Sequence, residues 1–362
     1  MDDNIENIEE NDYEQHLSLL VLSLIWNLFY SKSSGAHLFG ALKLLEFTFL
    51  GIYALFEFQK RDIRGFITVL SLSAVISSTL SIWQFLNQSS VGGLWYFFGE
   101  RTFNISTIGI STVNLDHLVL RPYAAFPHPN VLAFFLLTAI IFIVPRISYE
   151  KRSVVKMFLI LTILLSTVGL FLTFARVAIL LTIAFLLYEI YANLKSKRFA
   201  ITLTVILGIL SIFVFSNIFR AEFLLRGVDF REELLFQSYE VFLSSPYFGV
   251  GINNFFVHQV DLVKNISPIL FQPPHNIFVL ALLQLGLFGW WIFPAIFFFA
   301  IRSLIKKLKA KSQELKAFYT SVLFILIAII IVGMFDHFFL TLEQGQIVLA
   351  LILGLSFAKL KN

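Results

Sequence analysis

Residues 317–335 read AFYTSVLFILIAIIIVGMF and contain no charged side chain. A helix needs about 20 mostly apolar residues to cross a hydrocarbon core of roughly 30 Å, so this stretch is long enough to span a membrane. Comparable apolar runs occupy residues 132–144 and 157–174. A soluble protein has too little polar surface to cover so many apolar helices. The sequence therefore predicts an all-α, polytopic integral membrane helical bundle.

The overall composition agrees with a membrane protein. Hydrophobic residues make up 58% of the chain and charged residues 14%, whereas soluble domains carry about 25% charged residues. The chain has no cysteine, which excludes disulfides and thiolate metal sites. Its net charge of +4 comes from basic residues in short loops between the apolar runs, so we expect no nucleic-acid partner.

We expect about ten transmembrane helices. They are placed near residues 17–30, 38–58, 65–86, 131–145, 154–173, 177–192, 200–218, 276–300, 317–335 and 342–358. Lysine and arginine collect in cytoplasmic loops. A cytoplasmic N-terminus puts eighteen of these residues on the inner side and eight on the outer side. The prediction is therefore a multi-pass protein of the cytoplasmic (inner) membrane.

This topology divides the chain into four segments. They are an acidic cytoplasmic tail at 1–16, helices one to seven at 17–218 with an outer loop at 87–130, a long extracytoplasmic loop at 219–275, and helices eight to ten with a cytoplasmic tail at 276–362. In the long loop, residues 229–243 have apolar residues at helical spacing, followed by Pro246, Gly249 and Gly251. Because proline and glycine end helices, we expect a helical extracytoplasmic cap here.

Several arginines lie on the predicted outer side. Arg176 occupies a tight turn between two apolar spans, where a charge is costly unless it pairs or reaches the membrane surface. Arg220, Arg226 and Arg231 lie close together in the long loop. A guanidinium group is suited to bind phosphate oxygens. Because carboxylates lie among these arginines, a solvated charged surface is the alternative interpretation.

Two histidines directly precede predicted spans. His128 stands between prolines in FPHPN, residues 126–130, and His275 follows two prolines in QPPHN, residues 272–276. Histidine can exchange a proton near neutral pH, and the prolines restrict the backbone around it. The alternative is a structural role at each helix start, with Asn130 as the cap of the helix that follows His128.

A further acid and histidine adjoin each other in the last predicted outer turn. Asp336 and His337 could form an acid–imidazole pair, although adjacency in sequence does not establish it. Outer histidines could also bind a metal, but their spacing fits no short ligand motif. The chain also lacks HExxH, Walker and GxGxxG motifs. We therefore expect no metal and no cofactor.

These polar segments resemble those of the O-antigen ligase and polymerase family. His275-Asn276, nine residues and then Gly286-Leu287-Phe288-Gly289 are similar to the H-[N/S/Q]-x9-G-x-x-G pattern of O-antigen ligases. The other similar segments, in family order, are RPYAAFPHPNVLAFFL (121–136), LTFARVAILL (172–181), REELLFQSYEVFLSSPYFGVG (231–251) and DHFFLTLEQ (336–344). Ala175 stands where the family usually has serine, and the family usually has twelve spans.

The resemblance implies a glycosyltransferase whose active site faces the periplasm or cell exterior. Such enzymes pass a glycan from a polyprenyl-pyrophosphate carrier in the lipid bilayer to a hydroxyl on an acceptor glycolipid or growing glycan. The resemblance makes His275 the group that activates or orients this hydroxyl, and Arg231 and Arg176 the catalytic cations. The substrate-binding residues that it implies are Arg121, Arg226, His128, Asn130 and Asn276. It leaves Gly286 and Gly289 with a structural role, in which two helices approach closely.

Two other classes of function, a transporter and a structural scaffold, are alternatives, and within the transferases the choice between ligase and polymerase stays open. A glycolipid transporter or flippase would usually carry ionisable residues deep in the membrane. The predicted span interiors of this chain are nearly free of charge, apart from Lys43, Glu46 and Glu57, which favours a transferase. A structural scaffold does not explain the ordered motifs. A ligase and a repeat-unit polymerase share these features, so both remain alternatives.

Overall fold

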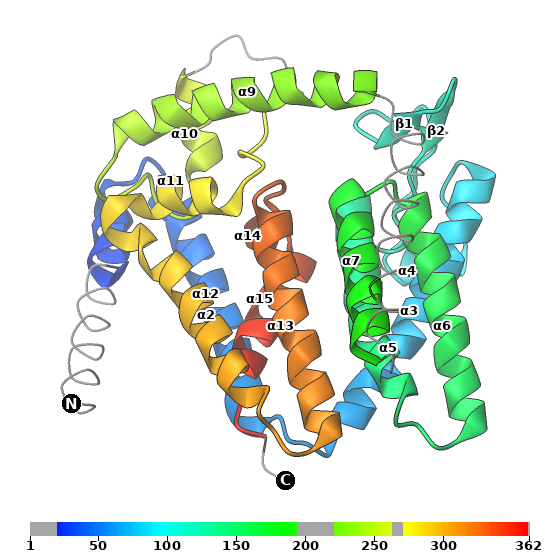
Figure 1. Cartoon of the computed structure of the whole chain (residues 1–362). Coiled ribbons are helices and arrows are strands. Elements are labelled where there is room, and N and C mark those ends of the chain that lie inside the picture. Colours follow the sequence, from blue (N-terminus) through cyan, green and yellow to red (C-terminus); the bar gives the residue numbers. More distant parts are fainter. Residues whose placement is uncertain (1–19, 194–200, 202–220, 263–270, 361–362) are drawn as a thin grey trace, which may run out of the picture. The chain divides into compact units, whose positions relative to one another are not determined.

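The computed structural model describes residues 20–193, 201, 221–262 and 271–360 (Figure 1). For residues 221–230 and 261–262 it describes the backbone alone. The helices are Leu20–Tyr30, α2 (Ser34–Glu57), α3 (Asp62–Asn87), α4 (Leu94–Phe97), α5 (Pro129–Ile147), α6 (Ser153–Leu172), α7 (Arg176–Asn193), α9 (Ala221–Ser244), α10 (Phe255–Leu262), α11 (Ile277–Trp290), α12 (Ile292–Lys307), α13 (Gln313–Gly333), α14 (Phe338–Thr341) and α15 (Glu343–Phe357). The strands are β1 (Thr112–Asn114) and β2 (Leu118–Leu120).

Among the described residues, six helices are long and apolar enough to cross a membrane. They are α2, α3, α5, α6, α7 and α13. Each coincides with an expected span, which supports a multi-pass helical membrane protein. Helix Leu20–Tyr30 and α15 are shorter apolar helices at two further expected positions. The tail at 1–16 and the expected span at 200–218 lie outside the described residues, so the number of ten stays a prediction.

The expected span at 276–300 is broken into two helices, which together are long and apolar enough to cross a membrane. Helices α11 and α12 meet at an angle of 87°, and within α11 Gly286 has non-helical angles, with φ 66°. A preceding segment supplies hydrogen bonds there. Leu287 N–H donates to the Pro246 carbonyl at 2.9 Å, and Val250 N–H donates to the Leu283 carbonyl at 2.9 Å. These bonds compensate for the interrupted helical pattern.

Glycines allow this close backbone contact. A Cβ on Gly286 would overlap the backbone of residues 247–249, and a Cβ on Gly249 would overlap the backbone of α11. Both residues have positive φ, which glycine adopts readily. The predicted approach of two helices holds for Gly289, which lies against Ser23 of helix Leu20–Tyr30. Gly286 instead contacts a connecting segment.

The chain forms two compact units. The first contains residues 1–54, 221–303 and 333–357, and its described helices include α9, α10, α11, α14 and α15. Helix α9 includes all of the predicted helix at 229–243 and ends at Ser244, just before the predicted breaker Pro246. Buried side chains of α9, α10, α11 and their connection form one cluster: Val241, Val250, Phe255, Leu280 and Leu283. The role of α9 as an extracytoplasmic cap stays a prediction.

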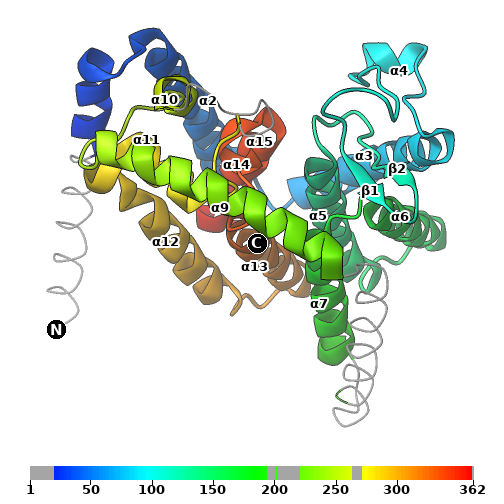
Figure 2. The same cartoon turned by 90° about the horizontal axis from the view of Figure 1, so that it is seen from above.

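The second unit contains residues 55–220, 304–332 and 358–362. In it α5 packs beside α3, α6 and α7, as Figure 2 also shows. Helix α5 is buried along most of its length, with Leu132, Leu136 and Ile140 fully inaccessible. The Ser321 hydroxyl of α13 donates to the Ile141 carbonyl at 2.8 Å, which joins α13 to this core.

The predicted outer loop at 87–130 belongs to this second unit and contains a small sheet. Strands β1 and β2 pair antiparallel, with Val113 opposite Val119, so the all-α prediction misses a hairpin. Gln84 and Glu100 hold the loop in place. Glu100 accepts hydrogen bonds from the Gln84 amide and from the N–H groups of Val91 and Gly92, each at 2.7 Å. Because both side chains are buried, this network orders the loop.

Candidate functional site

His275 stands in a backbone turn that the start of α11 holds in place. The Asn276 side chain accepts hydrogen bonds from the N–H groups of Phe278 at 2.9 Å and Val279 at 3.1 Å, so it caps α11. Pro273 and Pro274 are buried just before it. The cap orients His275 through the backbone. Contact of Asn276 itself with substrate stays a prediction.

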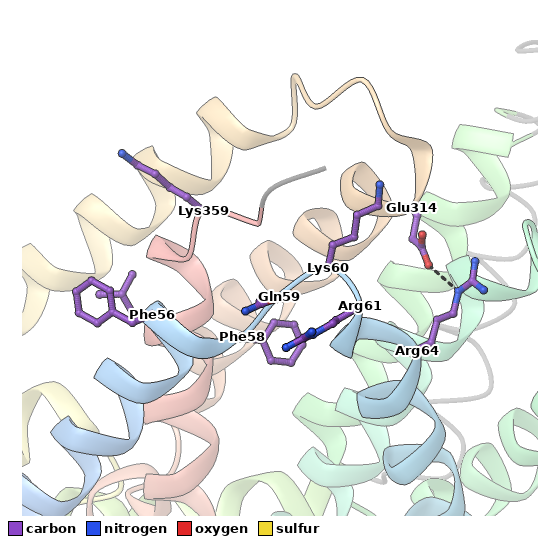
Figure 3. A pocket seen from close by; sticks show the side chains of 9 residues that line it. Phe56, Phe58, Gln59, Lys60, Arg61, Arg64, Glu314 and Lys359 are labelled. Carbon is purple, nitrogen blue, oxygen red and sulfur yellow. Dashed lines mark hydrogen bonds and ion pairs between the residues drawn. The ribbon is translucent and has the colours of Figure 1, made fainter.

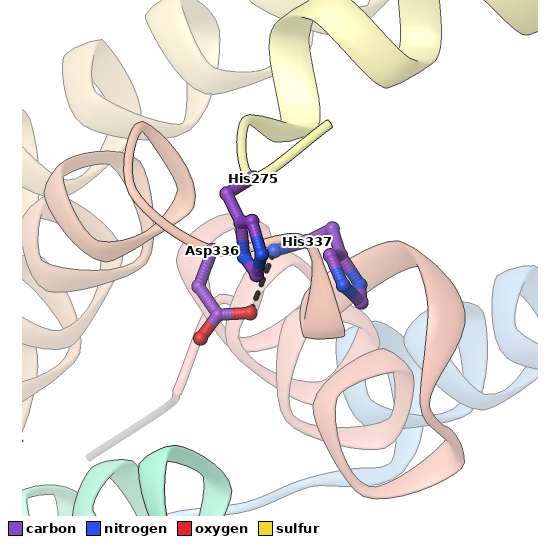
Figure 4. Close-up of side chains that lie close together, drawn as sticks. All are labelled: His275, Asp336 and His337. Carbon is purple, nitrogen blue, oxygen red and sulfur yellow. Dashed lines mark hydrogen bonds between the residues drawn. The ribbon is translucent and has the colours of Figure 1, made fainter. Parts of the chain in front are cut away.

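The end of α13 brings Asp336 and His337 next to His275. Gly333 makes this approach possible, because a Cβ there would overlap the side chain of Ile277 at the start of α11. The ring centroids of His275 and His337 lie 5.1 Å apart. Figure 4 shows the three side chains converging, and one polar atom from each lies within 4.8 Å of the other two. We call this group the imidazole cluster.

Hydrogen bonds order the imidazole cluster internally. The buried Asp336 carboxylate accepts the backbone N–H of His337 at 2.8 Å. His337 Nδ1 lies 2.7 Å from the Thr341 hydroxyl, which donates to the His337 carbonyl at 3.1 Å. The tautomer of His337 decides which of the two groups donates in the contact between Nδ1 and Thr341.

The environment keeps both imidazoles neutral at pH 7. Burial lowers the pKa of His275 to about 4, while Asp336 raises it and His337 and Arg231 lower it further. Burial also lowers the pKa of His337, with Asp336 acting in the opposite direction. A neutral imidazole can accept a proton or a hydrogen bond, which a protonated one cannot do.

Arg231 of α9 is the one described arginine whose charge shifts the pKa of His275. This effect is one sign that Arg231 lies near the cluster. Its guanidinium carbon also lies 6.0 Å from the ring centroid of Phe335, the residue before Asp336. The structure thus brings two of the predicted catalytic residues, His275 and Arg231, into one site. Arg226 is also on α9, but its side chain lies outside the described part of the chain.

The imidazole cluster also has the composition of a metal site. Zn²⁺ binds imidazole nitrogen and carboxylate oxygen, and catalytic zinc sites usually take three protein ligands. His275, Asp336 and His337 are the one such group of three found among the described residues. The sequence motifs did not suggest this group, because its members come from separate segments. The predicted absence of a metal therefore needs a direct test.

A second polar group forms in the other unit around Arg121. Its guanidinium donates to the Ser111 hydroxyl at 2.9 Å, to the Asn130 side-chain oxygen at 2.7 Å, and to the Thr173 carbonyl. Thr173 immediately precedes the turn that leads into Arg176, the first residue of α7. Arg121 therefore ties the outer loop to the turn that carries Arg176. We call this group the Arg121 cluster.

His128 completes the Arg121 cluster at the start of α5. Its Nδ1 accepts the N–H of Asn130 at 3.1 Å, so His128 caps α5 and its Nδ1 carries no proton. The alternative that made Asn130 the cap is wrong. Asn130 instead uses its side-chain oxygen to accept from Arg121. Contacts of these residues with substrate stay predictions.

Three groups were missed or left outside the predicted site. Asp336 and His337 were noted only as a pair without a partner, because their contact with His275 depends on tertiary packing. Thr341 was missed, although it stands four residues after His337, which is the spacing of neighbours on a helix. Ser111 gives no signal in the sequence, since it lies in an irregular loop.

Comparison with known proteins gives a match that includes the three predicted catalytic residues. Residues 160–294 match the O-antigen ligase family model. This stretch contains Arg176, Arg231 and His275 and ends before the Asp336 segment. A search of curated proteins gives no match. The family match, together with several apolar helices, supports the assignment of this chain to the O-antigen ligase and polymerase family of polysaccharide biosynthesis.

Proposed function

We propose that the protein is a membrane glycosyltransferase. It moves a glycan from a polyprenyl-pyrophosphate carrier to an acceptor hydroxyl on the outer face of the inner membrane. The observation that carries this proposal is the imidazole cluster, where a desolvated neutral His275 lies beside Asp336 and within the electrostatic influence of Arg231. His275 and Arg231 both belong to the stretch that matches the O-antigen ligase family.

The proposed reaction is one displacement at the anomeric carbon of the donor sugar. The acceptor oxygen forms a bond to that carbon while the bond from carbon to the pyrophosphate oxygen breaks. The acceptor proton passes to His275, and the electron pair of the broken bond leaves with polyprenyl pyrophosphate. Arg231 stabilises the negative charge that develops on the leaving group. A cation lowers the barrier most when the protein holds it in position before the reaction begins.

The low pKa of His275 fits this cycle. A group with a pKa of about 4 is neutral in the resting protein and ready to accept a proton. A bound pyrophosphate would add negative charge close to the imidazole, which raises its pKa. Asp336 acts in the same direction. His275 would thus become a stronger base once the donor is present.

We assign supporting roles to the other predicted residues. The resemblance implies that Arg176 is a further cation for the pyrophosphate, and within its own unit Arg121 bonds to the Thr173 carbonyl and so holds the turn that carries Arg176. The resemblance also implies substrate contacts for Arg226, His128, Asn130 and Asn276. The same chemistry serves a repeat-unit polymerase when the acceptor is itself a growing glycan, so the product distinguishes the two activities.

The test is donor cleavage by the full-length protein in lipid nanodiscs. The protein is incubated with polyprenyl-pyrophosphate glycan and candidate acceptors, and released polyprenyl pyrophosphate is followed by mass spectrometry. We expect release by wild type and loss in His275→Ala and Arg231→Ala. The product mass then separates a ligase from a polymerase. A folded wild type that moves glycolipid across liposome membranes without cleaving it would instead establish a transporter.

A second experiment, with a chelator, tests whether the imidazole cluster binds a metal ion. If His275 acts as a base without metal, dialysis against EDTA leaves the rate unchanged and no stoichiometric metal is found by elemental analysis. Loss of activity in EDTA with recovery on adding Zn²⁺ would assign the cluster as a metal centre and overturn the proposed role of His275 as a base.

A further inference from the structure

A basic pocket lies in the second unit, at the ends of three candidate membrane spans. It has a volume of about 780 Å³ and is lined by residues where α2 ends, α3 begins and α13 begins, together with Lys359 just after α15. Its polar lining is Gln59, Lys60, Arg61, Arg64, Glu314 and Lys359, and its apolar lining is Leu55, Phe56 and Phe58. The proposed glycan transfer uses none of these residues.

The pocket carries an excess of positive charge. Four cationic side chains line it, against one carboxylate. Glu314 accepts from Arg64 at 3.3 Å, so this acid is already engaged (Figure 3). Among the described residues, no ion pair joins Lys60 or Lys359 to a carboxylate. Arg61 lies 3.8 Å from Asp62 and remains highly exposed. An anion in this pocket would therefore meet two lysines without an ion pair to any described carboxylate, and Arg61, whose ion pair with Asp62 is long and exposed.

The fold holds Lys359 in this position. Lys359 is exposed, while its neighbours Ala358 and Leu360 are buried. The hydroxyl of Tyr319 on α13 donates to the Ala358 carbonyl and accepts the Leu360 N–H, both at 3.1 Å. The segment is thus fastened to α13 on both sides of Lys359. These bonds fix the backbone at Lys359 and so determine where its exposed side chain leaves the chain.

Aromatic residues give the pocket a wall suited to hydrocarbon. Phe56 is 73% exposed near the end of α2. Phe58 stacks on Phe318 with ring centroids 5.6 Å apart. A soluble anion gains nothing from an exposed phenylalanine, whereas an acyl chain does. A second pocket shares Lys359 and is lined by Lys306, Lys307, Lys309 and Lys311, which extends the basic surface.

We propose that this pocket binds the phosphate headgroup of an anionic phospholipid, with Lys60, Arg61 and Lys359 around the phosphate and Phe56 along an acyl chain. Basic pockets at the cytoplasmic ends of membrane helices are suited to such headgroups. The predicted topology puts this pocket on the inner side. The site is separate from glycan transfer, so it can fail while the proposed function holds.

The test compares two triple variants of the full-length protein. The pocket variant carries Lys60→Gln, Arg61→Gln and Lys359→Gln. The control carries Lys151→Gln, Lys156→Gln and Lys316→Gln, three exposed lysines of the same unit that do not line the pocket. Both lose the same charge. Delipidated protein is titrated with phosphatidylglycerol or phosphatidylcholine, and bound lipid is counted by native mass spectrometry.

We expect wild type and control to retain phosphatidylglycerol over phosphatidylcholine, and the pocket variant to retain about tenfold less. Equal loss in both triple variants would overturn the site, since general surface charge would then explain retention. Displacement of the lipid by excess inorganic phosphate would identify a soluble-anion site instead. If the triple variant does not fold, Arg61→Gln alone decides, because this exposed side chain is not needed for packing.

Discussion

His275 was predicted to act on the acceptor hydroxyl and Arg121 to bind substrate, and the protein surrounds these two residues differently. His275 sits in a largely desolvated cluster that shifts its pKa to about 4. Arg121 donates hydrogen bonds to three protein acceptors in the other unit. A group poised by burial is suited to proton transfer, whereas a group bonded to its own protein is suited to hold other segments in place. The comparison therefore favours proton transfer at the imidazole cluster and a positioning role for the Arg121 cluster, and the substitutions below test both.

Substitution of His275 should have the largest effect on activity. Removal of a general base commonly costs about 10²–10⁴-fold in rate, and we expect His275→Ala to fall in this range. The matched control is His117→Ala, which changes an exposed histidine next to β2. Donor cleavage is measured for both variants in nanodiscs. Equal activity of wild type and a folded His275→Ala would break the assignment of chemistry to this cluster.

Gly286→Ala should destabilise the unit that contains His275. A Cβ at this position overlaps the backbone of residues 247–249, and the positive φ disfavours alanine. We expect a loss of about 2–4 kcal/mol, seen as a lower thermal unfolding midpoint. Gly65→Ala in α3 is the control, because a Cβ there meets nothing within 4 Å. Unchanged stability of Gly286→Ala would show that the bend in α11 is not required.

Arg121→Gln should reduce stability more than it reduces the intrinsic rate. Loss of the guanidinium leaves the Thr173 carbonyl and the Asn130 side chain without this donor, and we expect a cost of about 2–3 kcal/mol. Arg101→Gln provides a graded control, since Arg101 is exposed and donates to the Pro127 carbonyl. Unfolding midpoints and donor cleavage are measured together. A large rate loss at unchanged stability would instead make Arg121 a direct substrate contact.

The smallest expected effect is a dependence of stability on pH. The unfolded chain protonates His275 near pH 6.5, whereas the folded protein resists protonation until about pH 4. Stability is therefore full above pH 6.5 and falls with decreasing pH, by about 1 kcal/mol between pH 6.5 and 5.5. His337 shifts in the same direction. Unfolding midpoints across this range should show a shallower slope in His275→Gln, and an unchanged slope would mean that His275 is not desolvated.

The helices were largely predictable from the sequence, because each depends on the residues within its own segment. An uninterrupted apolar run such as 317–335 must form a helix to satisfy its backbone in a membrane, and α13 covers most of it. The helix at 229–243 was predictable from its spacing and its breaker at Pro246. The break at Gly286 within α11 was not, because the backbone there bonds to residues 246–251, a segment that lies earlier in the chain.

For the candidate site, the sequence by itself determined the chemistry-bearing residues and the order of their segments. His275 follows two prolines, and Arg231 opens a segment similar to one in O-antigen ligases. Only the tertiary structure decided which of these groups meet. Gly333 lets the end of α13 approach Ile277, and this packing brings Asp336 and His337 to His275. Contacts between distant segments depend on side-chain packing and burial, which no local pattern encodes.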